Sequence, residues 1–103
     1  MFGERHLSLH ITNRARDWIN DYTQRAGLRE PIPLFQWSRI RGEDHEQLMI
    51  GVYERGNVRE GWLGIAGDFQ FVVIQEWLFD RLDGKTLDAI LDAEGRIRLS
   101  VTT

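Results

Sequence analysis

Hydrophobic residues occupy alternate positions near the start of the chain and then recur every three or four positions. Leu7, Leu9 and Ile11 alternate with polar residues, which predicts a short, half-buried strand over residues 7–11. A hydrophobic stripe at helical spacing follows, formed by Ala15, Trp18, Ile19, Tyr22 and Ala26. The pattern therefore predicts a strand followed directly by an amphipathic helix.

Residues that begin and end helices flank this hydrophobic stripe. Thr12 and Asn13 both suit the N-cap position, although neither places Glu or Gln where a capping box needs it. Gly27 lies where a helix commonly ends with a left-handed residue. Pro31 and Pro33 then prevent the helix from continuing.

Short alternating segments separated by turn residues make up the rest of the chain. The connections are too short for parallel crossovers, so antiparallel pairing is expected. The apolar run over residues 69–74 indicates a strand that is buried on both faces. The predicted strands cover residues 34–40, 47–54, 58–65, 69–74, 86–91 and 96–101, and a short helix or turn covers residues 75–82.

Together these elements predict an α+β fold that is mostly β. Small twisted antiparallel sheets are expected to form a sandwich or pseudo-barrel, with one N-terminal helix and one short late helix. A chain of 103 residues is too short to be divided into two useful cores, so residues 1–103 are expected to form a single domain.

The composition is ordinary for a soluble globular protein, and it argues against several classes of partner. The formal net charge of −3 argues against nucleic acid, because contacts with phosphates need a basic surface. The longest apolar runs cover only a few residues, far fewer than the roughly 20 that span a bilayer. Residues 1–6 lack the apolar core of a signal peptide. We therefore expect a cytoplasmic protein that does not associate with membranes.

The sequence contains no cysteine, so the chain has no thiolate with which to hold a metal ion or an iron–sulfur cluster. His6 and His10 would lie about 13 Å apart on one strand, too far for both to bind one zinc ion. His45 follows Glu43 and Asp44 in an acidic turn, where a solvated hairpin tip is the ordinary interpretation. Neither a metal nor another cofactor is predicted. His10, His45, Glu43 and Asp44 remain candidate binding residues.

Four tryptophans in a chain of this size are unusual. Trp18, Trp37, Trp62 and Trp77 fall in separate elements, and each has aliphatic neighbours at a spacing that suits a core. Alternatively, one or two of them line a pocket or a dimer interface. Trp62 is the best candidate for exposure and for binding, because it lies among the glycines of residues 61–67. Those glycines indicate a bulge or the close approach of another backbone.

No catalytic residue is predicted. The serines fall within predicted strands, and not at the sharp strand–turn–helix elbow of a nucleophile. Pairs of carboxylates occur only in turns or on exposed faces, whereas general acid–base catalysis would require one with a shifted pKa.

Three segments of the chain resemble the HesB-like iron–sulfur cluster biosynthesis domain, the fold of the A-type cluster carriers. Residues 9–19 are similar to the family's opening strand, Ile-Thr and helix, and residues 69–74 to its apolar central strand. Residues 82–88, Leu-Asp-Gly-Lys-Thr-Leu-Asp, look like its turn into the last strands. The spacing of these segments makes the resemblance span the whole chain, and it implies a HesB-like sandwich or pseudo-barrel.

The chain departs from this family at the residues that hold the cluster. A-type carriers resemble one another in one cysteine after a glycine-rich turn and in a Cys-x-Cys tail, and this sequence has no counterpart to either. It is therefore most similar to a cysteine-lacking branch of the family, and an iron–sulfur cluster is not expected. We expect a non-enzymatic module that binds a protein or a small molecule and forms a homodimer. The alternative is a small metabolite-binding protein or enzyme that uses carboxylates and Trp62 around a pocket.

Overall fold

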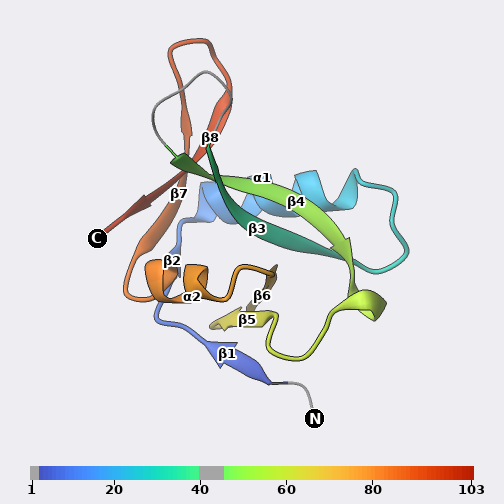
Figure 1. The fold of residues 1–103 in the computed structure, drawn as a ribbon. Coiled ribbons are helices and arrows are strands. Elements are labelled where there is room, and N and C mark those ends of the chain that lie inside the picture. The colour runs from blue at the N-terminus through green and yellow to red at the C-terminus, as the bar shows by residue number, and fades with distance from the viewer. Residues whose placement is uncertain (1–2, 40–45) are drawn as a thin grey trace.

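The structure, a computed structural model, describes residues 3–39 and 46–103, and it contains two helices, one 3-10 turn and eight strands in this part of the chain (Figure 1). In chain order the elements are β1 (Glu4–His6), β2 (His10–Ile11), α1 (Asn13–Gln24), β3 (Pro31–Arg39), β4 (Glu46–Glu54), η1 (Arg55–Asn57), β5 (Leu63–Ala66), β6 (Phe69–Val73), α2 (Trp77–Leu82), β7 (Thr86–Leu91) and β8 (Ile97–Thr102). The predicted α+β class, mostly β with an N-terminal helix and a short late helix, is confirmed. Neither helix in the described ranges is long and apolar enough to cross a bilayer.

The strands form two mixed sheets that do not close into a barrel. The larger sheet has the order β1-β5-β6-β3-β4, and the smaller has the order β2-β7-β8. The three hairpins are antiparallel as predicted, but β1 pairs with β5, β2 with β7 and β3 with β6 in parallel. Each sheet is therefore mixed, although antiparallel pairing dominates as expected. The expectation considered only connections between consecutive strands, and the parallel pairs join strands that are distant in the sequence.

Of the predicted strand over residues 7–11, only His10–Ile11 forms a strand, β2 of the smaller sheet. β1 of the larger sheet lies before the predicted range, and Ser8 lies between β1 and β2. The Ser8 N–H donates to Asp83 Oδ1 at 2.8 Å, and the Ser8 carbonyl accepts from Gly84 N at 2.7 Å. The turn between α2 and β7 therefore takes the hydrogen bonds that a continuous strand would have made. The predicted alternation of buried and exposed side chains still holds at Leu9 and Ile11, which are both in the core.

Strand β3 begins at Pro31, earlier than the predicted residue 34. Arg55 N donates to Glu30 O at 2.9 Å, so alternation along the antiparallel β3–β4 pair puts Pro31 and Pro33 at non-hydrogen-bonded positions. Their nitrogens then face away from β4, and the missing N–H groups cost that hairpin nothing. The prolines are therefore compatible with the first three residues of the strand.

Between β4 and β6 the chain forms less strand than the sequence predicted. Residues 55–57 form the 3-10 turn η1, and β5 begins only at Leu63, so the predicted strand over residues 58–65 is shorter than expected. Gly67 and Asp68 form the two-residue turn of the β5–β6 hairpin. Gly67 has a φ of +64° at the first central position, as type II′ turns require.

The start of helix α1 is attached to the smaller sheet through Asp88 of β7. Thr12 is the N-cap, and its hydroxyl oxygen accepts from Ala15 N at 3.2 Å while it donates to Asp88 Oδ1 at 2.6 Å. Arg14 forms a bidentate interaction with the same carboxylate, donating from Nε at 2.6 Å and also from Nη2. These bonds hold the pKa of Asp88 well below its usual range. One carboxylate therefore fixes where α1 begins and how it approaches the sheet.

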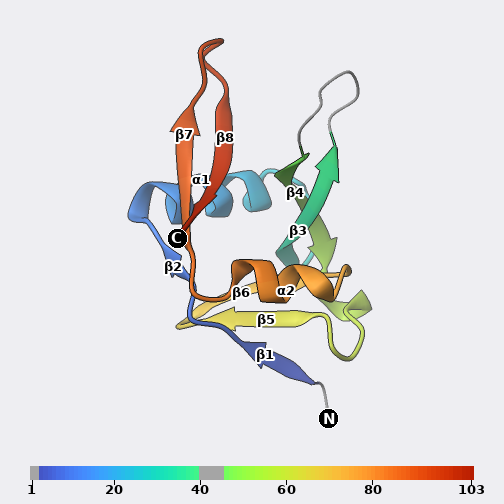
Figure 2. The ribbon, with the colours of Figure 1, turned by 60° about the vertical axis from the view of Figure 1, so that its left-hand side comes forward.

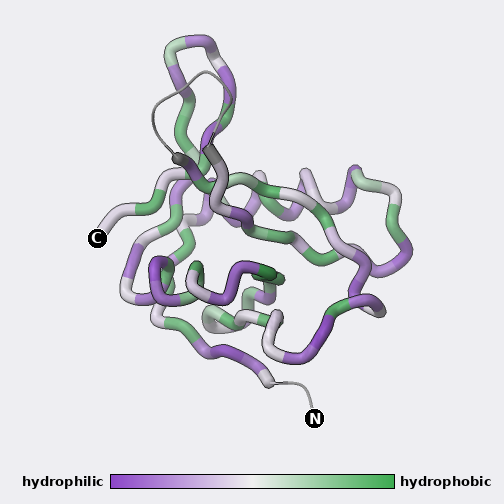
Figure 3. Tube along the Cα trace, viewed as in Figure 1, coloured by the Kyte–Doolittle hydropathy of each residue, from purple (hydrophilic) through white to green (hydrophobic). Residues whose placement is uncertain are grey.

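The core lies between α1, α2 and the two sheets, as the views of Figures 1 and 2 show together. Phe71 and Val73 of β6 face this main cluster, whereas Val72 packs with Ile32 and Leu34 on the opposite face of the larger sheet. The prediction that residues 69–74 are buried on both faces therefore holds for Phe69, Phe71, Val72 and Val73, whereas Gln70 and Ile74 are exposed. In Figure 3 hydrophobic residues colour much of β6, whereas β1 and the segment after β4 are largely hydrophilic.

Gly64 of β5 is one of the glycines that the sequence associated with close packing. A Cβ atom built on it would lie 2.5 Å from the Phe71 ring and 2.8 Å from the Phe79 ring. Both rings are buried, and their centroids are 6.3 Å apart. The close contact predicted from this glycine is therefore with aromatic side chains and not with another backbone.

We predict that Gly64→Ala lowers the free energy of unfolding by about 2 to 3 kcal/mol, because two buried rings would have to move to admit one methyl group. The matched control is Gly51→Ala in β4, where the nearest atoms to an added Cβ belong to Leu34 at 3.6 Å and 3.9 Å. This control should lie within about 1 kcal/mol of the wild type. Urea denaturation measures both variants. Equal losses in the two would refute the packing argument.

We also predict that stability falls as the pH drops below about 5. The pKa of Asp88 is lowered by Arg14 and Thr12, that of Asp68 by Arg16, and that of Asp92 by the Arg96 N–H. The unfolded chain, in which an aspartate has a pKa of about 3.9, therefore binds more protons than the folded chain in acid. The stabilisation is complete above the unfolded pKa and is lost as the pH falls toward the folded values.

Denaturation curves between pH 2.5 and pH 7 test this prediction, with Asp88→Asn as the informative variant. Asp88→Asn should be less stable than the wild type at pH 7 and should lose less stability on acidification, since one of the shifted carboxylates is gone. Thr12→Ala, which removes the N-cap, should cost about 1 kcal/mol at pH 7. An unchanged acid slope in Asp88→Asn would contradict the assignment.

Candidate ligand-binding cleft

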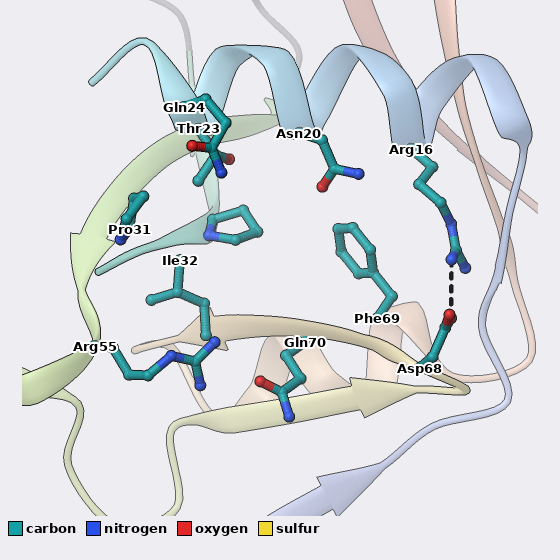
Figure 4. A pocket seen from close by; sticks show the side chains of 11 residues that line it. Arg16, Asn20, Thr23, Gln24, Pro31, Ile32, Arg55, Asp68, Phe69 and Gln70 are labelled. Atoms are coloured by element: carbon teal, nitrogen blue, oxygen red, sulfur yellow. Dashed lines mark hydrogen bonds and ion pairs between the residues drawn. The ribbon is translucent and has the colours of Figure 1, made fainter. Parts of the chain in front are cut away.

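A cleft of about 340 Å³ opens between one flank of α1, the start of β3 and the start of β6 (Figure 4). Helix α1 forms one side of the cleft, and the strands with η1 form the other. The lining residues are Arg16, Asn20, Thr23, Gln24, Pro31, Ile32, Pro33, Arg55, Asp68, Phe69 and Gln70. Its volume falls at the lower end of the range typical of small-molecule sites.

The helix contributes polar side chains to the cleft because of its periodicity. Arg16, Asn20 and Gln24 are spaced four residues apart and so lie along one flank of α1. The adjacent stripe, Ala15 and Ile19, is fully buried in the core. The polar flank therefore projects past the edge of the core and over the strands below it.

The strands separate beneath this flank because of Pro33. The parallel ladder between β3 and β6 starts only at Leu34, the first residue after that proline. A proline has no N–H to donate to a neighbouring strand, so the ladder does not extend toward Pro31. Phe69 is buried here on the face toward α1, whereas Ile32 is buried on the opposite face of the larger sheet, and both border the gap between the strands.

An ion pair closes one end of the cleft. Arg16 Nη1 lies 2.8 Å from Asp68 Oδ1, and the Arg16 guanidinium lies over the Phe69 ring, 5.7 Å from its centroid. Arg16 holds the pKa of Asp68 below its usual range, first through the hydrogen bond and then through its charge. The only carboxylate among the lining residues is therefore neutralised by its neighbour.

The other polar side chains of the cleft are not used to hold the fold together. Asn20, Gln24, Gln70 and Arg55 are all exposed, and their side chains make no hydrogen bond or ion pair within the described part of the chain. Thr23 differs, because its hydroxyl donates to Ile19 O at 2.7 Å. Three amides and one guanidinium therefore border the cleft with their hydrogen-bonding groups available.

The candidate residues from the sequence lie elsewhere. His10 is exposed on β2, where its backbone N–H donates to the Lys85 carbonyl at 3.0 Å, and it does not line the cleft. Glu43, Asp44 and His45 lie outside the described residues. Within residues 3–39 and 46–103, no group of three or more histidines and carboxylates is arranged to hold a metal ion.

Trp62 is half-buried and is not the most exposed tryptophan. Its ring lies edge-on to Tyr53 at a centroid distance of 5.9 Å, and the Arg59 guanidinium lies 5.4 Å from its centroid. Trp77 of α2 is 46% exposed, so the sequence-based choice of Trp62 for exposure is wrong. Trp62 packs against the cluster of Ile32, Leu34 and Val72, and its neighbours Tyr53 and Arg59 cover its ring.

The cleft residues were missed because they form no motif. Four of the lining residues lie on α1, while the rest come from three other short segments that meet only in the fold. Two sequence signals could have indicated the region. One is the polar spacing of Arg16, Asn20 and Gln24, and the other is the pair of prolines at the start of β3.

Comparison of this chain with protein-family models, curated proteins and solved structures finds no match. The side chains of the cleft, their charges and their contacts are therefore the basis on which a ligand can be inferred.

Proposed function

We propose that this chain is a non-enzymatic binding module that holds a small polar organic molecule in the cleft between α1, β3 and β6. The observation that carries the proposal is that Asn20, Gln24, Gln70 and Arg55 line one cleft, and that their side chains make no hydrogen bond or ion pair with the residues that the structure describes. Polar side chains that already bind one another would have to exchange those bonds for a ligand. These four need only give up water.

The chemistry of the lining residues favours binding over catalysis. General acid–base catalysis works best with a group whose pKa lies near the working pH. Asp68 is the one carboxylate in the cleft, and Arg16 moves its pKa in the opposite direction. The remaining polar groups are amides, guanidinium groups and the Thr23 hydroxyl, which recognise a ligand but do not exchange protons near neutral pH.

The resemblance to HesB-like domains is part of the same proposal. The three similar segments fall on β2 with the start of α1, on β6, and on the turn from α2 into β7. In this proposal the chain is a cysteine-free member that binds a molecule other than an iron–sulfur cluster. A cytoplasmic location and a homodimer remain predictions from the sequence.

We predict that filling the cleft abolishes binding without unfolding the protein. A thermal-shift screen of sugars, sugar phosphates and organic acids should give at least one compound that raises the midpoint of unfolding. A ligand at 100 times its Kd stabilises the folded state by about 2.7 kcal/mol. Asn20→Trp places a large ring in the opening from an exposed position, and it should reduce the affinity for that compound at least tenfold.

Asp21→Trp is the matched control, because Asp21 is the exposed neighbour on the solvent-facing side of α1, and its ion pair with Arg25 is a surface pair. This variant should bind like the wild type. The proposal fails if no compound in the screen shifts the midpoint, or if Asn20→Trp and Asp21→Trp bind equally well.

A further inference from the structure

We propose that the ligand of the cleft is an organic anion, with a carboxylate or phosphate group bound by Arg55. This inference rests on the proposed binding function and specifies the chemical class of the molecule. Its basis is the charge left over in the cleft once the internal ion pair has been taken into account.

The cleft is locally positive on a protein that is negative overall. Its charged lining residues are two arginines and one aspartate, whereas the whole chain carries a formal net charge of −3. The ion pair between Arg16 and Asp68 neutralises one arginine at 2.8 Å. Arg55 therefore supplies the positive charge that remains uncompensated.

Arg16 is poorly suited to bind the anion itself. Its guanidinium is held at one end by the Asp68 carboxylate and lies over the Phe69 ring at 5.7 Å. A ligand anion would have to displace the carboxylate to reach it. Arg55 requires no such exchange.

The position of Arg55 is fixed by its backbone, while its side chain remains available. Its N–H donates to Glu30 O at 2.9 Å, and its carbonyl accepts from Val58 N at 3.1 Å, so η1 is held on both sides. The neighbouring Glu54 carboxylate accepts from the Glu30 N–H at 2.9 Å, and these two described residues, Glu54 and Arg55, form no ion pair with each other. In Figure 4 the Arg55 side chain lies at the end of the cleft opposite the Arg16–Asp68 pair, below Ile32.

The other lining groups indicate which chemical groups the rest of the ligand carries. A guanidinium presents a planar set of N–H donors that matches the oxygens of a carboxylate or a phosphate. Asn20, Gln24 and Gln70 carry no charge and can both donate and accept hydrogen bonds, which suits hydroxyl or carbonyl groups. Phe69 adds an apolar surface. A small molecule with one anionic end and a polar body fits these groups.

Two pairs of probes test this inference by isothermal titration calorimetry. Benzoate and benzamide differ in charge at nearly constant shape, and ribose 5-phosphate and ribose differ by the phosphate. We expect at least one anion to bind at least tenfold more tightly than its neutral counterpart, with an affinity that falls as salt is added. The pair that shows this difference identifies the ligand group as a carboxylate or a phosphate.

Arg55→Gln should weaken binding of that anion at least tenfold, and Arg55→Lys should keep part of the affinity because it retains the charge. Arg96→Gln is the matched control, since it removes one arginine charge from an exposed residue between β7 and β8. It should leave the affinity unchanged. Arg55 is exposed, so circular dichroism should show that all three variants fold.

The outcomes separate this inference from the proposed function. Equal binding of charged and neutral probes, or an Arg55→Gln variant that binds the anion normally, overturns the anion assignment and leaves the binding role of the cleft intact. Binding of neutral compounds from the thermal-shift screen, with no binding of either anion, also overturns it. If neither the probes nor the screen yields a ligand, the proposed function fails as well.

Discussion

The carboxylate of Asp88 is the constraint on which the rest of the arrangement depends. It lies on a strand near the end of the chain, and it receives hydrogen bonds from Thr12 and Arg14 at the start of α1. A helix N-cap usually needs only a local acceptor, but here the capping hydroxyl is itself held by a distant residue. The position of α1 relative to both sheets follows from this contact. So does the position of the polar flank that forms one side of the cleft.

Pro33 and the helix produce the cleft together. A strand residue with an N–H at that position could have continued the β3–β6 ladder toward the start of β3, bringing the two strands together. Because the ladder stops at Leu34, side chains border the gap between the strands, among them that of Phe69. The polar residues above it are exposed, so their unpaired groups are solvated and cost little. The cleft is therefore compatible with a stable fold while its hydrogen-bonding groups remain free.

The stability and the proposed function of the protein rely on different residues. Buried side chains on both faces of the larger sheet, among them Phe71 and Val72, hold the fold together, and Gly64 allows the rings to pack closely. The proposed binding residues are exposed and do not take part in that packing. Variation in the cleft can therefore change the ligand without a large cost in stability, as expected for sites placed on a fold.

The sequence by itself determined the elements with a strong local pattern. It predicted the N-terminal helix with its N-cap at Thr12 or Asn13, the left-handed Gly27 after it, the β3–β4 hairpin and the burial of most of β6, because periodicity and turn chemistry act over a few residues. It also excluded thiolate ligands outright. Only the tertiary structure decided the parallel pairings, the assignment of β1 and β2 to different sheets and the partner of Asp88, since each depends on residues far apart in the sequence. The cleft belongs to this second group: its residues are ordinary surface residues in the sequence, and only packing brings Arg55 and the flank of α1 to the same opening.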